Sequence, residues 1–272
     1  MKTNPIVRAM LAWVPCPEIE QPRTRRPDFS EWGISGESAR FLSKSPNALL
    51  IAAVFDRMIR AEQAWESPRL LAKRLGHFDV RRIAVMEPDA LARFIGPYGG
   101  EPSLHRFRNQ IADCTVAACQ RLVDQYGANA QNIWNADPGA AEVLRRLQEF
   151  KGISQKIANM TVRLLITYYA VQLSGWSAVD VAVDRHVARV FLRTGLVVEG
   201  GGGPSFNVGK VREEVIQRAR ELFPLYPGAL DEPAFIIGKE WCTAEHAYCC
   251  ETEQHCPLVG ACPGKRKRWQ VV

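Results

Sequence analysis

Apolar side chains recur along this sequence at intervals of three or four residues over most of its length. That spacing places them on one face of an α-helix, whereas a half-buried strand needs strict alternation. The nearest approach to alternation is the short stretch AVDVAVD, residues 178–184. We find no internal repeat and no succession of strands and helices. The pattern therefore predicts an all-α fold.

Capping signals divide this pattern into separate helices. Ser45 followed by Pro46 predicts an N-cap with a proline in the first turn, and the apolar stretch over residues 47–65 then predicts one long helix. Pro68 and Pro88 are each expected to begin a helix that ends at the next glycine. Residues 1–44 are expected to be irregular, with one helix near 36–43. Further helices are expected over 104–126, 138–150, 155–173, 185–195, 211–223 and 231–241.

The composition is that of an ordinary globular protein. Of 272 residues, 47% are hydrophobic and 24% are charged, which suits a chain with a packed core. No apolar run approaches the roughly 20 residues that span a bilayer. The N-terminal stretch, with three prolines and Cys16, is a poor signal peptide. We therefore expect a cytoplasmic protein, associated with the nucleoid if the source is prokaryotic.

Basic residues are in excess, and their distribution is uneven. The formal net charge is +6, which is compatible with a polyanionic partner but is common in enzymes. The densest cluster is Lys265, Arg266, Lys267 and Arg268 near the C-terminus. Any single arginine elsewhere is more typical of solvated surface than of a binding site.

A short connection, FKGIS, joins two of the expected helices. Gly152 within it permits a sharp backbone turn. The N–H groups at the start of the following helix then face outward, where oriented amides and the helix dipole bind a phosphate whatever the base sequence. A helix–turn–helix of this kind occurs in many bundles, so its context decides its meaning.

The context resembles the endonuclease III superfamily of helix-hairpin-helix DNA glycosylases. LQEFKGISQKIAN is similar to the hairpin of that family, with Ser154 in place of its second glycine. VDRHVARVFLRTG is similar to its Val-Asp-x-His segment, which places Asp184 and His186 on matching positions. ALLIAAVFDRMIRAEQAW and DEPAFIIGKEWC resemble its first barrel helix and the helix before its metal cluster. These four matches occur in the family's order and cover residues 45–262. In the hairpin, the matching positions are Phe150, Gly152, Ile153, Lys156 and Ala158.

The resemblance implies a two-lobed fold and a reaction. A six-helix barrel lobe is expected over residues 45–160 and a cluster lobe over 161–272, with the arm 1–44 packed on the latter. In the lysine-bearing members of the family, the residue matched by Lys156 attacks the sugar and the residue matched by Asp184 stabilises its positive charge. We therefore expect a monomeric, bifunctional glycosylase/AP lyase that acts on double-stranded DNA.

Other readings of these residues stay open. Asp180 lies in a similar AVDV context and is a second candidate carboxylate, although no histidine and helix follow it. A protein that keeps the hairpin without Lys156 chemistry would be a non-catalytic DNA-binding module. A third reading is a monofunctional glycosylase for mismatched thymine or uracil.

Five of the eight cysteines lie within the last 31 residues. Such clustering favours metal binding over disulfides. Cys242, Cys249, Cys256 and Cys262 form C-x6-C-x6-C-x5-C, with Cys250 as an alternative to Cys249. The family has C-x6-C-x2-C-x5-C, which implies a [4Fe–4S] cluster held by four thiolates. Zinc is the competing reading, although the paired short knuckles typical of zinc sites are absent from the sequence.

The sequence gives a weaker indication of which side chains would contact an extruded base. Family members place a glutamine at the end of the first barrel helix, where it fills the gap that the flipped nucleotide leaves. Met58, preceded by Arg57, occupies that position here, and an ordinary core methionine is an equally good reading. Tyr168, Tyr169 and Trp176 are candidates for stacking, although buried aromatic residues are more common.

Overall fold

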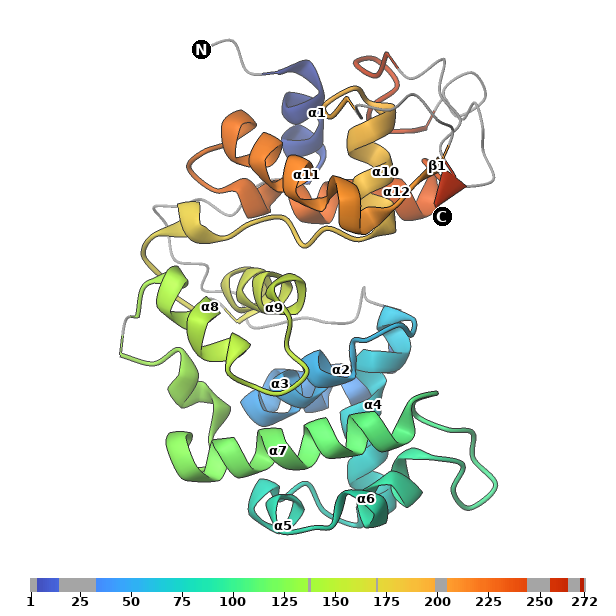
Figure 1. Ribbon diagram of the computed structural model, residues 1–272, viewed down its shortest axis with the longest axis vertical. Coiled ribbons are helices and arrows are strands. Elements are labelled where there is room, and N and C mark those ends of the chain that lie inside the picture. Colours follow the sequence, from blue (N-terminus) through green and yellow to red (C-terminus); the bar gives the residue numbers. More distant parts are fainter. Residues whose placement is uncertain are drawn as a thin grey trace. The chain divides into compact units, whose positions relative to one another are not determined.

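The computed structural model describes residues 4–14, 33–136, 138–169, 171–198, 205–243, 255–263 and 270–271. Its helices confirm the predicted all-α fold (Figure 1). Two strands of two residues each, β1 (Ser205–Phe206) and β2 (Gln270–Val271), pair in parallel. The α-helices are α1 (Pro5–Trp13), α2 (Gly36–Lys44), α3 (Pro46–Phe55), α4 (Ala61–Leu75), α5 (Val80–Ala84), α6 (Pro88–Ile95), α7 (Arg108–Tyr126), α8 (Ala140–Gln148), α9 (Gln155–Tyr168), α10 (Arg185–Arg193), α11 (Val208–Leu222) and α12 (Asp231–Glu240). Single turns of 3₁₀-helix lie at Ala130–Ile133, Trp176–Ala178 and Pro227–Leu230.

The chain forms two compact units. The central unit is Pro22–Ser174, and the terminal unit joins Met1–Gln21 to Gly175–Val272. From the sequence, boundaries were expected after residues 44 and 160. In the structure, α2 and the whole of α9 instead belong to the central unit. In the described residues, no helix is both long and apolar enough to cross a membrane.

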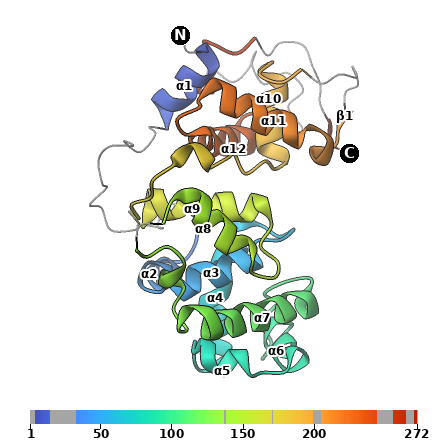
Figure 2. The ribbon, with the colours of Figure 1, turned by 60° about the vertical axis from the view of Figure 1, so that its left-hand side comes forward.

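Helix α3 is the core of the central unit. Every residue from Ala48 to Phe55 is fully buried, because neighbouring helices cover all of its sides. Figures 1 and 2 both show α7 between α3 on one side and the short helices α5 and α6 on the other. A helix that is apolar all round is one that other helices surround.

The prediction of one long helix over residues 47–65 is wrong. Helix α3 ends at Phe55, and α4 begins at Ala61. Pro68, expected to begin a helix, lies inside α4. The apolar spacing continues through the break, so periodicity alone hides it. The break matters because it places residues 56–60 in a turn, where Met58 and Arg60 are exposed and Asp56, Arg57 and Ile59 are half-buried.

The terminal unit packs α1 against the C-terminal helices. Ile6, Val7 and Met10 share a core with apolar residues of α10, α11 and α12. Residues 1–44 were expected to be irregular apart from one helix near 36–43, so α1 is an additional helix. Asn4 caps it, accepting a hydrogen bond from the Ile6 N–H at 2.9 Å, and Pro5 occupies its first turn.

The contact between α10 and α12 depends on Gly238. A Cβ atom at this position would lie 2.6 Å from the carbonyl oxygen of His186, which is a backbone atom. We expect Gly238→Ala to lower the free energy of unfolding by roughly 3 kcal/mol, since α10 and α12 would have to move apart to make room for the new Cβ. Thermal unfolding measures this effect. Gly260→Ala, where no atom lies within 4 Å of the new Cβ, is the control; an equal loss of stability in both variants would contradict the packing argument.

Candidate functional site

The turn between α8 and α9 forms the hairpin predicted from FKGIS. Gly152 has φ +96°, a conformation that favours glycine, and a Cβ there would lie 3.1 Å from the Cys114 Sγ. Phe150 is buried and stacks on Tyr126 at a centroid distance of 5.7 Å. Lys151 forms an ion pair of 2.6 Å with Asp113 of α7. The turn is therefore fixed on both sides by α7.

Ser154, which replaces the family's second hairpin glycine, caps α9. Its hydroxyl oxygen accepts a hydrogen bond from the Ile157 N–H at 3.4 Å. Its φ of −80° is open to any L-residue. The substitution therefore keeps the helix start, whose first-turn N–H groups have no carbonyl partners within the helix.

Lys156 is the second residue of α9. Its side chain is 31% exposed, and its Nζ lies 3.9 Å from the Oδ2 of Asp56, which is only 10% exposed. Asp56 follows the last residue of α3. The break after α3 therefore brings a carboxylate to the lysine, in the same unit as the hairpin.

The residues that follow Asp56 lie beside the hairpin. The Arg57 guanidinium is 3.9 Å from the Cys114 Sγ and within 3.5 Å of the position a Gly152 Cβ would take. Met58 is 72% exposed with φ +56°. The reading of Met58 as a core residue is therefore wrong. Arg57 at Gly152 and Asp56 at Lys156 thus bring the turn that carries Met58 beside the hairpin.

Asp184 lies in the terminal unit, as the N-cap of α10. Its Oδ1 accepts hydrogen bonds from the N–H groups of His186 and Val187 at 2.8 and 2.9 Å. This confirms the predicted cap, and the helix N-terminus stabilises the carboxylate charge. The His186 Nδ1 lies 3.0 Å from the Gly238 carbonyl oxygen. Burial lowers the pKa of His186, which favours its neutral form.

Asp180, the other candidate carboxylate, is buried in a bidentate ion pair. Its two oxygens accept hydrogen bonds from Arg220 at 2.7 and 2.8 Å. Such a pair ties residue 180 to α11 and gives this carboxylate a structural role.

Three of the four predicted cluster ligands lie in the described part of the terminal unit. Cys242 is buried in its core, and Cys256 and Cys262 are partly buried against the same core. Cys249, Cys250 and the basic residues 265–268 lie outside the described residues. Among those that are described, no three potential ligands are close enough to hold a metal.

The surroundings of Cys242 suit an anionic group. The Arg193 Nη1 lies 3.5 Å from the Cys242 Sγ, and Arg189 donates to the Cys242 carbonyl oxygen. Both arginines are buried, and the Nε and Nη2 of Arg193 have no hydrogen-bond partner among the described residues. Buried cationic N–H groups without acceptors are costly. A thiolate-bound cluster carries the negative charge that would compensate them, so these residues fit [4Fe–4S].

Comparison with solved structures decides the fold. A trapped endonuclease III–DNA covalent intermediate, an estranged-adenine complex, matches with a TM-score of 0.54 and 19% identity, over 84% of this chain and 92% of that one. A non-covalent endonuclease III–DNA complex matches with a TM-score of 0.55 and 20% identity, over 84% and 91%. This chain has the endonuclease III fold. No protein-family model and no curated protein matches the sequence.

Within this endonuclease III fold, the aromatic candidates have structural contacts. The hydroxyl of Tyr169 donates to the Leu42 carbonyl oxygen, and burial raises the pKa of Tyr169. Trp176 makes an edge-to-face contact with Tyr226 at a centroid distance of 5.0 Å. Both contacts anchor these rings to the protein.

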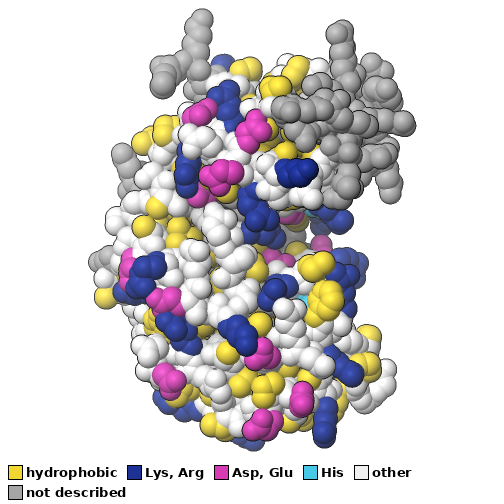
Figure 3. Space-filling view, in the orientation of Figure 1, with side chains coloured by type: hydrophobic (Ala, Val, Ile, Leu, Met, Phe, Trp, Pro, Cys, Tyr) yellow, Lys and Arg dark blue, Asp and Glu magenta, His cyan; other side chains and the backbone are white. Residues whose placement is uncertain are grey.

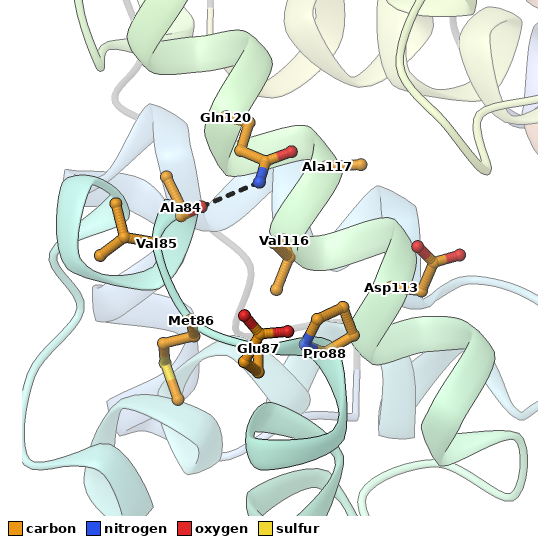
Figure 4. A pocket seen from close by; sticks show the side chains of 9 residues that line it. All are labelled: Ala84, Val85, Met86, Glu87, Pro88, Asp113, Val116, Ala117 and Gln120. Atoms are coloured by element: carbon orange, nitrogen blue, oxygen red, sulfur yellow. Dashed lines mark hydrogen bonds between the residues drawn. The ribbon is translucent and has the colours of Figure 1, made fainter.

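A small hollow lies elsewhere in the central unit (Figure 4). It has a volume of about 200 Å³ and lies where α5, α6 and α7 meet; Gln120 donates to the Ala84 carbonyl oxygen at 3.0 Å across its edge. Neither Lys156 nor Met58 lines it. Its lining residues are Ala84, Val85, Met86, Glu87, Pro88, Asp113, Val116, Ala117 and Gln120.

Charges on the exposed face of α8 are paired. Glu142 binds Arg145 and Arg146, both at 2.8 Å, and Glu149 binds Arg145 and Arg121. Figure 3 shows basic and acidic side chains intermixed in this part of the surface. This face is therefore a solvated one.

Two residues beside this site carry no clear signal in the sequence. Asp56 falls inside the predicted long helix, and His105, whose Nε2 lies 3.0 Å from the Arg57 carbonyl oxygen, lies outside every motif. A break signal for Asp56 is weak, because no glycine or proline marks it.

Proposed function

We propose that this protein is a DNA glycosylase that removes a damaged or mispaired base from duplex DNA and then cuts the strand by β-elimination. The observation that carries the proposal is the placement of Lys156 in an endonuclease III fold. This lysine is partly exposed and lies in the first turn of α9, four residues after Gly152 of the hairpin. The protein would act in base-excision repair as a monomer.

Lys156 is assigned the role of nucleophile. Its neutral amine would attack the anomeric carbon of the sugar while the N-glycosidic bond breaks and the base leaves. Opening of the sugar ring would then give a Schiff base, from which β-elimination expels the 3′-phosphate and cuts the strand. One of the structurally similar proteins is an endonuclease III trapped as a covalent intermediate with DNA, which supports this chemistry here. A glycosylase without lyase activity would not need an amine at this position.

Asp184 is assigned the stabilisation of positive charge. Breaking the N-glycosidic bond builds positive charge on the sugar, and a fixed carboxylate lowers the energy of that state. The two hydrogen bonds to Oδ1 hold the carboxylate in one orientation. Both hydrogen bonds go to Oδ1, and the carboxylate of Asp184 keeps its negative charge while it accepts them.

DNA contacts are assigned to backbone and side chains of both units. The first-turn amides of α9 would bind a phosphate, and Met58, exposed on its turn, would fill the gap left by the flipped nucleotide. Basic side chains would add contacts to the phosphate backbone. The full set is Gly152, Ser154, Arg57, Met58, His186, Lys265, Arg266, Lys267 and Arg268.

A [4Fe–4S] cluster is proposed on Cys242, Cys256, Cys262 and one of Cys249 or Cys250. Its role would be structural, holding the C-terminal loop. We expect the purified protein to contain about four iron atoms and to absorb light at about 400 nm, and Cys242→Ser to lose both the iron and the absorbance. Cys119→Ala, in the central unit, is the control and should keep its iron. Stoichiometric zinc in place of iron would contradict the cluster.

Duplex oligonucleotides test the function as a whole. They would carry uracil, thymine glycol, 8-oxoguanine, hypoxanthine or a mismatched thymine, and base release and strand cutting would be scored separately. We expect release of at least one base, together with cutting. Release without cutting would favour a monofunctional mismatch glycosylase, and binding without release would favour a non-catalytic hairpin protein.

A further inference from the structure

Two large apolar side chains of the central unit are exposed on segments that meet at Arg57 and His105. Met58 lies in the α3–α4 segment (residues 56–60) and is 72% exposed. Phe107 lies in the α6–α7 segment (residues 103–107) and is 41% exposed, with the Arg106 guanidinium 4.6 Å from its ring centroid. The left-handed φ of Met58, +56°, is strained for a residue with a side chain. Surrounding contacts must hold such a conformation in place.

His105 links the two segments. It is fully buried, and its Nδ1 accepts a hydrogen bond from the Phe107 N–H at 3.0 Å. The proton of the neutral ring is therefore on Nε2, which donates to the Arg57 carbonyl oxygen at 3.0 Å. Burial lowers the pKa of His105 and so favours this neutral form. One imidazole thus fixes the backbone on both sides.

The α6–α7 segment has anchors of its own. The Gln63 side-chain amide of α4 donates to the Leu104 carbonyl oxygen at 2.9 Å. The Ser103 hydroxyl donates to the His105 carbonyl oxygen at 2.7 Å. These hydrogen bonds hold the α6–α7 segment in place. The Nε2–H of His105 then fixes the backbone of Arg57, the neighbour of Met58, relative to this segment.

We propose that His105 is a positioning residue that holds Met58 and Phe107 at a fixed spacing, so that both enter the duplex together beside an extruded nucleotide. The proposal rests on the proposed function and adds a residue that no motif contains.

Two conservative variants separate the hydrogen bonds of His105. The carbonyl of asparagine matches the Nδ1 position and keeps the local bond to residue 107, but His105→Asn loses the donor toward Arg57. The amide nitrogen of glutamine reaches the Nε2 position, so His105→Gln keeps the bond to Arg57. If His105 acts by positioning, the hydrogen bond to the Arg57 carbonyl oxygen is the one that matters, and only the glutamine variant keeps it.

The experiment measures the affinity of the full chain for a duplex with a tetrahydrofuran abasic-site analogue and for the undamaged duplex. We expect the ratio of the two affinities to fall about tenfold in His105→Asn. His105→Gln should restore it to within about twofold of wild type. Melting temperatures show whether both variants are folded.

His77→Gln is the matched control. The His77 Nδ1 accepts the Asp79 N–H at 3.2 Å, the same local bond that His105 makes with Phe107, and the affinity ratio should not change. A wild-type ratio in His105→Asn, or an equal loss in His105→Gln, would overturn the positioning role alone. A wild-type protein without preference for the abasic-site duplex would overturn the proposed function and this proposal with it.

Discussion

Replacing Lys156 by alanine is expected to abolish borohydride trapping of the protein on DNA. The trapped species is a reduced Schiff base, which requires an amine, and we assign that amine to Lys156. Removing a nucleophile costs on the order of 10³-fold or more in rate. The side chain is 31% exposed, so its loss should leave the fold intact. Gel separation of the covalent complex, formed on a duplex with an abasic site, measures the effect.

Lys151→Ala is the control for this prediction. Lys151 lies five residues away in the same hairpin and is paired with Asp113, so its loss should reduce trapping only slightly. Trapping that persists in Lys156→Ala, or that disappears equally in both variants, would remove Lys156 from the reaction.

Replacing Asp184 by asparagine is expected to slow base release about 100- to 1,000-fold. An amide oxygen still accepts the hydrogen bonds from His186 and Val187, so α10 keeps its cap. Only the negative charge is lost, to which we assign the stabilisation of the developing sugar cation. Single-turnover release of the base measures this effect, once a substrate is found.

Asp180→Asn provides the contrast. It weakens the bidentate pair with Arg220, so we expect a lower melting temperature and little change in base release by the folded protein. The reverse outcome, in which Asp180→Asn slows release and Asp184→Asn does not, would transfer the catalytic role to Asp180.

Much of the fold could be predicted because its signals are local. Caps and prolines identified the starts of α3 and α6, and the N-cap role of Asp184 followed from the sequence of its own neighbourhood. The hairpin was predicted because Gly152 stands in a short connection between two periodic segments. These features depend on residues within one or two helical turns.

The break at residues 56–60 could not be predicted in the same way. Its turn is held by contacts with residues far along the chain, namely His105 on Arg57 and Lys156 beside Asp56. The apolar spacing across it resembles one long helix, and no glycine marks the positive φ of Met58. The ion pair of Asp180 with Arg220 spans 40 residues and was equally hidden.

The most direct test of the central claim is to locate the covalent bond to DNA. The wild-type protein would be trapped with borohydride on a duplex containing an abasic site and digested, and the modified peptide identified by mass spectrometry. The account predicts that the sugar remnant is attached to Lys156. Attachment to the N-terminal amine or to another lysine, or the absence of any adduct, would contradict it.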